Sequence, residues 1–388
     1  MLYALLATLA CTDGPKRSVL WVSIDGARQD ALPPRADGFP TIGAWTNEAQ
    51  VFTSVFAHSD APVVQAWNAQ GSVTPEALGP DPTAWTGTTL AAHLSAEGWA
   101  TAAFVGRDEL AQRSSGPRAG FTYWDDVPPD LARSLPSLVT RANAWAEQQS
   151  GPTFVWIVVA EGGAPYTPSS APAAPAADFD GSAATIAPYR DGERPVDGAA
   201  LARARALYAA ELEEVDAGLE PLVEPWKDAV VVVSSHHGES FHPAWPFRSD
   251  RCLSDSVLHV PLVVRVPGLA AATHDRLAGV IDIAPTVASA VGAAPLPGAS
   301  GVSLLAETPP RDWIAARTAG PDGDAMCGGF TTPALALRDA RLRAVWSDDR
   351  AEAWNPLTDP EEANPLEVPS SLVDARQAFI GAAIGAPR

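Results

Sequence analysis

Residues 18–26 read SVLWVSIDG, and this stretch decides the class of fold. The run SVLWVSI is almost continuously apolar, which is the pattern of a strand buried on both faces of a parallel sheet. Asp25 follows the strand directly, before Gly26. In open α/β sheets, functional groups gather where strands end and loops begin, so we interpret Asp25 as a candidate site residue. The alternative is that it forms an ordinary turn or caps a helix.

Similar segments farther along the chain extend the predicted sheet. Residues 88–106 have apolar positions at helical spacing, then Gly98, which stops the helix, and then the strand pattern ATAAFV. Residues 154–161 form another buried strand that ends at an acidic residue, Glu161. A helix is predicted over residues 199–225, and the strand AVVVVSS follows it directly. This alternation predicts an α/β protein with a mostly parallel sheet flanked by helices.

A second polar cluster stands at the end of the strand AVVVVSS, where His236, His237 and Glu239 follow. If this strand runs parallel to the first, the cluster lies at the same edge of the sheet as Asp25. One carboxylate and two imidazoles suit Zn²⁺ or another borderline cation, whereas all-oxygen sites prefer Ca²⁺ or Mg²⁺. Adjacent residues on an extended strand point in opposite directions, so both imidazoles reach one metal only if the chain turns there. The alternative is that the two histidines occupy positions of a former active site and bind no metal.

Composition limits the classes of partner. The chain has 388 residues, of which 46% are hydrophobic and 13 are Trp, and this argues against disorder. Its 37 Pro and 30 Gly predict many turns and long surface loops. A net charge of −20 repels the phosphates of nucleic acids and of anionic lipids. We therefore expect no nucleic-acid partner.

The first eleven residues, MLYALLATLAC, form a short apolar run that ends in small residues before Cys11, as a bacterial lipoprotein signal does. The run is too short to span a bilayer. We expect an exported protein, anchored in the cell envelope or periplasm through a lipid on Cys11, with no other membrane contact. The alternatives are a misassigned start and an unprocessed, frayed N-terminus. In an oxidising compartment Cys252 and Cys327 either pair or remain buried apolar side chains.

The order of motifs over roughly residues 18–370 resembles the sulfatase branch of the alkaline phosphatase superfamily. VLWVSIDGARQDAL is similar to the family's first strand with its metal-binding Asp. FVWIVVAEGGAPYTP is similar to the strand and loop that carry an active-site His, and AVVVVSSHHGES to the strand end that reads Asp-His-Gly-Glu in active members. Later landmarks follow in the family's order: SDSVLHVPLVVRVPG, IDIAPTVASAVG with GVSLL, and AWNPLTDPEEANPL.

The resemblance implies an architecture and a reaction. The expected fold is alkaline-phosphatase-like, with a leader and linker at 1–17, a core at 18–310 and a C-terminal subdomain at 311–388. The family's reaction is hydrolysis of sulfate or phosphate esters, in which a divalent cation lowers the pKa of the nucleophile. The implied substrate is a sulfated or phosphorylated small molecule or glycan.

The resemblance also implies site residues by position. The cation, Zn²⁺ or one of Ca²⁺, Mg²⁺ and Mn²⁺, would be held by Asp25, His236 and His237. Three more residues would surround the metal or the substrate, namely Glu239, His242 and Arg28. Glu239 either orients His237 as a hydrogen-bond acceptor or starts a helix as an exposed residue. Arg28 and Asp30 are expected to form a structural pair beneath the site.

The nucleophile position departs from the family pattern. Counting back from Gly71 or from Pro75 places Ala61 or Pro62 there, and neither side chain can attack. Ser59 and Asp60 are the nearby candidates, and a turn is the other interpretation of both.

Two further positions are also substituted. His236 stands where the family has its second ligand Asp, and Gly163 where it has a loop His. We therefore expect weak or absent hydrolase activity. The alternatives are a catalytically silent envelope protein that binds a glycan, lipid head group or protein through the old pocket, and a purely structural envelope protein.

Overall fold

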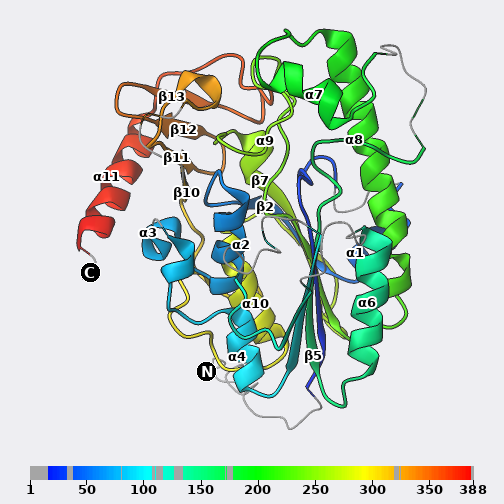
Figure 1. The fold of residues 1–388 in the computed structure, drawn as a ribbon. Coiled ribbons are helices and arrows are strands. Elements are labelled where there is room, and N and C mark those ends of the chain that lie inside the picture. The colour runs from blue at the N-terminus through cyan, green and yellow to red at the C-terminus, as the bar shows by residue number, and fades with distance from the viewer. Residues whose placement is uncertain are drawn as a thin grey trace.

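A large central sheet and a smaller antiparallel sheet organise the computed structural model (Figure 1). The structure describes residues 16–32, 38–79, 81–106, 110, 117–125, 134–170, 172, 178–318, 323 and 325–385. The predicted lipidation site, Cys11, lies outside these residues. Within them, no helix combines the length and apolar character needed to cross a membrane.

The central sheet contains nine strands among the described residues, in the order β4-β3-β5-β1-β6-β7-β2-β8, with β9 beside β2. β7 runs antiparallel to β6 and β2, and the other neighbouring pairs are parallel. The mostly parallel sheet predicted from the apolar runs is therefore confirmed. The strands are β1 (Val19–Ile24), β2 (Gln50–Phe56), β3 (Ala100–Val105), β4 (Tyr123–Asp125), β5 (Thr153–Val159), β6 (Val230–Ser234), β7 (His259–Arg265), β8 (Ala272–His274) and β9 (Ala278–Gly279).

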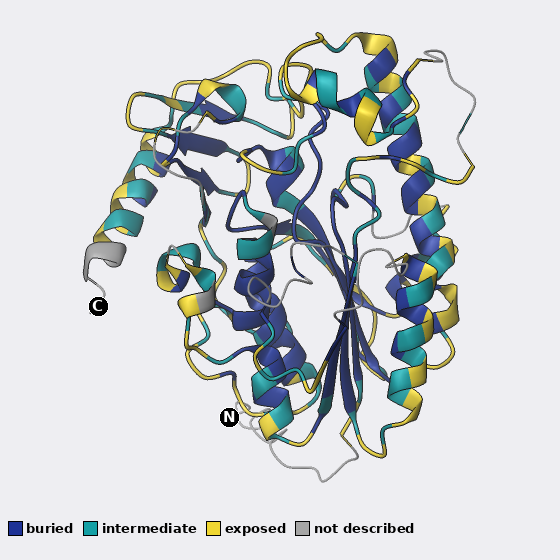
Figure 2. Ribbon diagram, in the orientation of Figure 1, coloured by how far each residue is buried: buried dark blue, intermediate teal, exposed yellow. Residues whose placement is uncertain are grey.

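Helices cover both faces of this sheet, because alternate side chains of each strand point to opposite faces (Figure 1). On one face, Trp21 and Trp156 pack in the core formed with α2 (Pro62–Gly71), α4 (Leu90–Ala96) and α10 (Ile283–Ala290). On the other face, Leu20 and Val22 pack with α1 (Pro40–Thr46), α6 (Leu135–Glu147) and α8 (Gly198–Leu219). Figure 2 shows the strands buried between these two layers.

The remaining helical segments are short or peripheral. They are α3 (Pro75–Leu78), α7 (Ala183–Arg190), α9 (Asp255–Leu258), α11 (Ser370–Gly385), η1 (Pro82–Ala84), η2 (Glu220–Leu222), η3 (Val280–Asp282) and η4 (Cys327–Gly329). The helix predicted over 199–225 is confirmed as α8 followed by η2. It begins where the Asp197 carboxylate accepts the N–H of Ala200 at 2.8 Å, as an N-cap does.

The smaller sheet is antiparallel, with the order β10-β11-β12-β13. Its strands are β10 (Ile314–Arg317), β11 (Leu335–Arg338), β12 (Arg343–Trp346) and β13 (Ala351–Trp354). Leu372 and Ala375 of α11 join the apolar cluster of this sheet. These elements all lie within the predicted C-terminal subdomain, whose boundary at residue 311 stays a prediction.

Candidate active site

Three adjacent parallel strands end at one edge of the central sheet. β1 pairs with β5 on one side and with β6 on the other, and Ile24 lies opposite Val159. Asp25, Glu161 and His236 follow the ends of these strands. β2 points the same way as β6, because both are antiparallel to β7. The loop after β2 therefore leaves the sheet at this same edge.

Asp25 and His236 contact each other directly. Oδ1 of Asp25 lies 2.7 Å from Nδ1 of His236, and the two residues are 0% and 1% exposed. The imidazole meets the ring of Trp156 edge to face, with centroids 5.8 Å apart. Nε2 of His236 is buried and has no hydrogen-bond partner among the described residues. The carboxylate thus holds the imidazole through a single ring nitrogen.

His236 and His237 lie beyond the strand, because β6 ends at Ser234. The N–H of His237 donates to Oγ of Ser235 at 3.2 Å, and Nδ1 of His237 lies 2.9 Å from the carbonyl oxygen of Gly238. The N–H of Gly238 donates to the carbonyl of Val257 at 2.7 Å. A Cβ at Gly238 would come within 2.1 Å of the Ser256 carbonyl oxygen, so only glycine fits this close approach.

These donors do not fit a resident divalent cation in the arrangement observed. In the part of the chain that the structure describes, no three His, Cys, Asp or Glu side chains are placed to hold a metal ion. Two of the three predicted ligands, Asp25 and His236, bond to each other. The three-ligand site predicted from the sequence is therefore not seen, because the imidazole that replaces the expected carboxylate is a hydrogen-bond partner for Asp25.

Glu239 is buried and connects two loops. Its Oε2 accepts the N–H of Ala164 at 3.0 Å, and its Oε1 accepts the N–H of Ser240 at 3.1 Å. Burial raises the pKa of the Glu239 carboxyl to about 7, although these hydrogen bonds act in the opposite direction. The prediction that Glu239 orients His237 is wrong, as is the exposed alternative, because the backbone of the loop after β5 approaches its carboxylate instead.

Arg28, in the loop after β1, forms the predicted pair with Asp30. Its Nε and Nη2 donate to the two carboxylate oxygens of Asp30 at 2.8 and 2.7 Å. Its Nη1 donates to the carbonyl oxygen of Glu239 at 3.2 Å. The planar guanidinium therefore joins the loop after β1 to the loop after β6.

Tyr208 of α8 is a site residue that the sequence analysis missed. Its hydroxyl donates to the carbonyl oxygen of Gly26 at 2.9 Å and accepts the N–H of Arg28 at 3.0 Å. Gly26 has φ +81°, and a Cβ there would lie 2.3 Å from the carbonyl oxygen of Gly162. The loops after β1 and β5 thus touch through backbone. The sequence feature that could have indicated a buried Tyr208 is its position next to Leu207, on the apolar face of a predicted helix.

The segment after β2 places Ala61 at the N-cap of α2, and Pro62 is the first residue of that helix. Oγ of Ser59 accepts the N–H of Ala61 at 3.2 Å, and the Ser59 carbonyl accepts from the amide of Gln65. The backbone N–H of Asp60 donates to the carbonyl of Arg317 at 3.4 Å. The Ser59 hydroxyl thus closes a short local loop onto Ala61, while Ser59 itself forms an isolated bridge with Arg317. The roles of Ser59 and Asp60 stay predictions.

The side chains of His242 and Glu161 make contacts outside the Asp25–His236 pair. The ring of His242 stacks on Trp245 with centroids 3.7 Å apart, and its Nδ1 accepts the N–H of Ala244 at 3.1 Å. The sequence placed His242 around the substrate, whereas these contacts are within its own loop. Oε1 of Glu161 accepts the N–H of Leu135 at 2.9 Å, so this carboxylate serves the first turn of α6.

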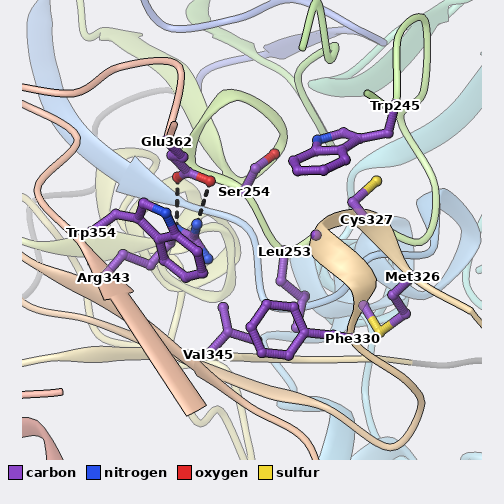
Figure 3. Close-up of a pocket in the computed structure, with 11 residues that line it drawn as sticks. Trp245, Leu253, Ser254, Met326, Cys327, Phe330, Arg343, Val345, Trp354 and Glu362 are labelled. Carbon is purple, nitrogen blue, oxygen red and sulfur yellow. Dashed lines mark hydrogen bonds and ion pairs between the residues drawn. The ribbon is translucent and has the colours of Figure 1, made fainter. Parts of the chain in front are cut away.

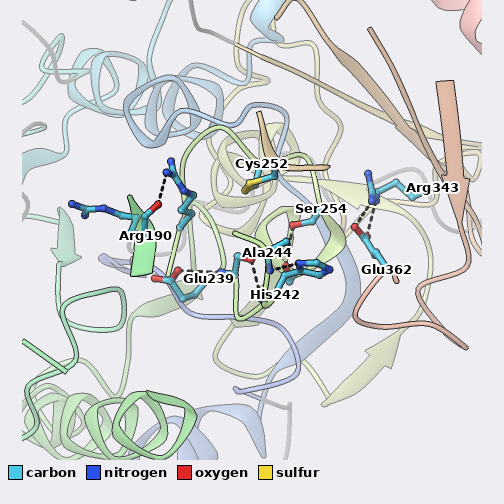
Figure 4. Close-up of a disulfide and its surroundings, with 12 residues drawn as sticks. Arg190, Glu239, His242, Ala244, Cys252, Ser254, Arg343 and Glu362 are labelled. Carbon is cyan, nitrogen blue, oxygen red and sulfur yellow. Dashed lines mark hydrogen bonds and ion pairs between the residues drawn. A yellow bond between two sulfur atoms is a disulfide. The ribbon is translucent and has the colours of Figure 1, made fainter. Parts of the chain in front are cut away.

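Cys252 and Cys327 form a disulfide with Cα atoms 5.0 Å apart (Figure 4). The bond connects the loop after β6 to η4. Along the chain, η4 lies between β10 and β11 of the smaller sheet. The sequence left open whether these cysteines form a disulfide or remain buried apolar side chains. The structure shows the disulfide.

An apolar pocket lies beside this disulfide (Figure 3). Trp245, Met326 and Phe330 line it, together with a buried ion pair in which Nε of Arg343 lies 2.8 Å from Oε1 of Glu362. None of its lining residues is one of the strand-end residues Asp25, His236 and Glu239. The pocket therefore belongs to the junction of the two sheets.

Comparison with known families identifies the fold. A family model described as Sulfatase matches residues 14–293, which is more than half of the chain. The chain belongs to the sulfatase family. A search of curated proteins found no match.

Solved structures resemble this sulfatase-family chain over nearly its whole length. A protein in complex with its substrate D-glucosamine-2-N,6-O-disulfate has a TM-score of 0.73 at 14% identity, covering 95% of this chain and 97% of its own. A phosphonate monoester hydrolase of Agrobacterium radiobacter has 0.68 at 17% identity, covering 95% of each chain. A protein in the alkaline phosphatase superfamily from Vibrio parahaemolyticus has 0.66 at 14%, covering 97% and 90%. Similarity at this level of identity supports a shared fold, and activity depends on the site residues.

Proposed function

We propose that this sulfatase-family protein hydrolyses sulfate and phosphate esters weakly or not at all. Membership of the family supports a site for the ester of a sulfated or phosphorylated small molecule or glycan. The observation that carries the proposal is Ala61 at the start of α2, where the family resemblance assigns the nucleophile. A methyl group has no atom that can attack the ester.

Ser59 is the nearest hydroxyl to that position along the chain. It is fully buried, and its oxygen already accepts the N–H of Ala61. A serine becomes a nucleophile when an adjacent base removes its proton. The partner observed for this hydroxyl is a backbone N–H and not such a base. These contacts favour a structural role for Ser59. They give no support for Ser59 as a replacement for the missing nucleophile.

The test compares the wild-type protein with a variant that carries Asp25→Asn and His237→Ala. We expect both to turn over aryl sulfates and aryl phosphates at the same background rate, because loss of the nucleophile removes most of the acceleration. Circular dichroism verifies that the variant is folded. Metal-dependent turnover by the wild type alone would contradict the proposal. Ser59→Ala and Asp60→Asn, made separately, would then identify the attacking group by loss of a covalent intermediate.

We also propose that the protein is exported and anchored through a lipid on Cys11. The Cys252–Cys327 disulfide supports an oxidising compartment, because such bonds persist mainly outside the cytosol. Cys11→Ala should move the protein from the membrane fraction to the soluble fraction, while Cys252 and Cys327 stay oxidised. Mature protein that retains Met1 by mass spectrometry would refute the lipid anchor.

A further inference from the structure

We propose that the hydrogen-bonded pair of Asp25 and His236 takes the place of a metal ion, and that His236 is the residue that keeps this site free of metal. The proposal goes beyond the proposed function, because metal content is measured without any substrate. A metal-free protein with turnover would refute only the proposed function, and a metal-bound protein without turnover would refute only this inference.

The distance between the two side chains is the first argument. Oδ1 of Asp25 and Nδ1 of His236 lie 2.7 Å apart, which is a normal distance for a charge-assisted hydrogen bond. Two atoms that bind one cation at about 2.1 Å each must lie about 3 Å apart or more, for octahedral or tetrahedral angles. A ring nitrogen that donates a proton to a carboxylate also has no lone pair for a cation. Oδ1 and Nδ1 are therefore bound to each other and not to a shared ion.

Charge is the second argument. Two carboxylates buried side by side repel each other unless a cation lies between them. At this position the second group is an imidazole, which adds no negative charge and donates a hydrogen bond to Oδ1 of Asp25. Both residues are almost fully buried, and the His236 ring packs against the Trp156 ring in a T-shaped contact. The two side chains are thus hydrogen-bonded to each other in a buried place.

Nε2 of His236 has no hydrogen-bond partner in the described part of the chain, and this allows one competing arrangement. In many metal sites a carboxylate orients a histidine through Nδ1, and Nε2 binds the metal. Such a site needs further ligands, and no group of three His, Cys, Asp or Glu side chains is suitably placed within the described ranges. This arrangement predicts that the wild type binds Zn²⁺, so the experiment distinguishes it from the proposal.

The experiment uses the full chain as wild type, H236D and H236N. Each protein is purified without chelator and analysed for metals, and is then titrated with Zn²⁺, Ca²⁺, Mg²⁺ and Mn²⁺ by calorimetry and thermal unfolding. H236D supplies a second carboxylate beside Asp25, whereas H236N has the same size and no charge. We expect no stoichiometric metal in the wild type or H236N, and no change in their Tm with EDTA. We expect H236D to gain one site for Ca²⁺ or Mg²⁺ and a Tm increase of roughly 4 °C when the ion exceeds its Kd about 100-fold.

Two outcomes would overturn the proposal. One is stoichiometric metal in the wild type that is lost in H236N, which would make Nε2 of His236 a ligand. The other is a folded H236D that binds no cation, which would show that His236 is not what keeps the site metal-free. If H236D does not fold, the metal content of the wild type and of D25N decides the question. The proposal requires that neither binds metal, and metal in the wild type that D25N lacks would refute it.

Discussion

Glu211 is a buried carboxyl group on the inner side of α8. Its Oε1 accepts the N–H of Thr167 at 3.3 Å, and its Oε2 has no hydrogen-bond partner among the described residues. Burial raises the pKa of Glu211 to about 7, and the nearby Glu161, Glu214 and Glu239 raise it further, although the bond from Thr167 lowers it. The folded protein therefore binds a proton on Glu211 more tightly than the unfolded chain does.

Glu211→Gln should change how the free energy of unfolding depends on pH. Because the folded pKa is raised, the stability that Glu211 contributes is present below pH 4.5 and is lost as the pH rises through about 7. Relative to the wild type, the glutamine variant should gain up to about 3 kcal/mol between pH 4.5 and pH 8. Urea unfolding at several pH values measures this difference.

Glu213→Gln is the matched control for this measurement, because Glu213 is exposed on the same helix. Its pH profile should follow that of the wild type. A parallel profile for Glu211→Gln would show that Glu211 has the same pKa in the folded and unfolded protein, and would refute the prediction.

At the scale of elements, the strand ends hold the site together through their loops. Glu239 joins the loops after β5 and β6 by accepting the N–H of Ala164. Arg28 joins the loops after β1 and β6, and Tyr208 attaches the loop after β1 to α8. Each contact links segments that are distant in sequence. The neighbouring central strands β5, β1 and β6 therefore present their following residues in a fixed arrangement.

The elements themselves were largely predictable. β1, β5 and β6 are continuous apolar runs, and such runs identify strands that are buried on both faces. The antiparallel direction of β7 between β6 and β2 was not predicted from its sequence. A continuous apolar run shows that a strand is buried on both faces, which is typical of parallel sheets, but it does not fix the direction of one individual strand. That direction depends on how the chain returns to the sheet.

At the scale of the whole molecule, the disulfide links the central sheet's loops to the smaller sheet. The bonded cysteines are 75 residues apart in sequence, and the bond lies beside the apolar pocket of Figure 3. A crosslink of this kind reduces the conformational entropy of the unfolded chain. It therefore stabilises the junction of the two sheets without any contact to Asp25 or His236.

Replacing both Cys252 and Cys327 with Ala should lower the free energy of unfolding by about 2–4 kcal/mol. The reason is that the unfolded chain gains conformational entropy when the disulfide no longer closes a loop in it. Chemical denaturation with and without reductant measures the change. Reductant should destabilise the wild type by a similar amount and leave the double variant unaffected. Equal stability of the oxidised wild type and the double variant would contradict the prediction.

The sequence by itself determined the sulfatase-type α/β fold, the buried strands, and the placement of Asp25 and His236 after strand ends. These features follow from local patterns of apolar residues and from the order of motifs. Only the tertiary structure decided that Asp25 bonds to His236, which lies 211 residues away, and that Glu239 accepts from Ala164 rather than from His237. The physical reason is that a local pattern specifies which side chains are buried, whereas the partner of a buried polar group depends on how distant segments pack.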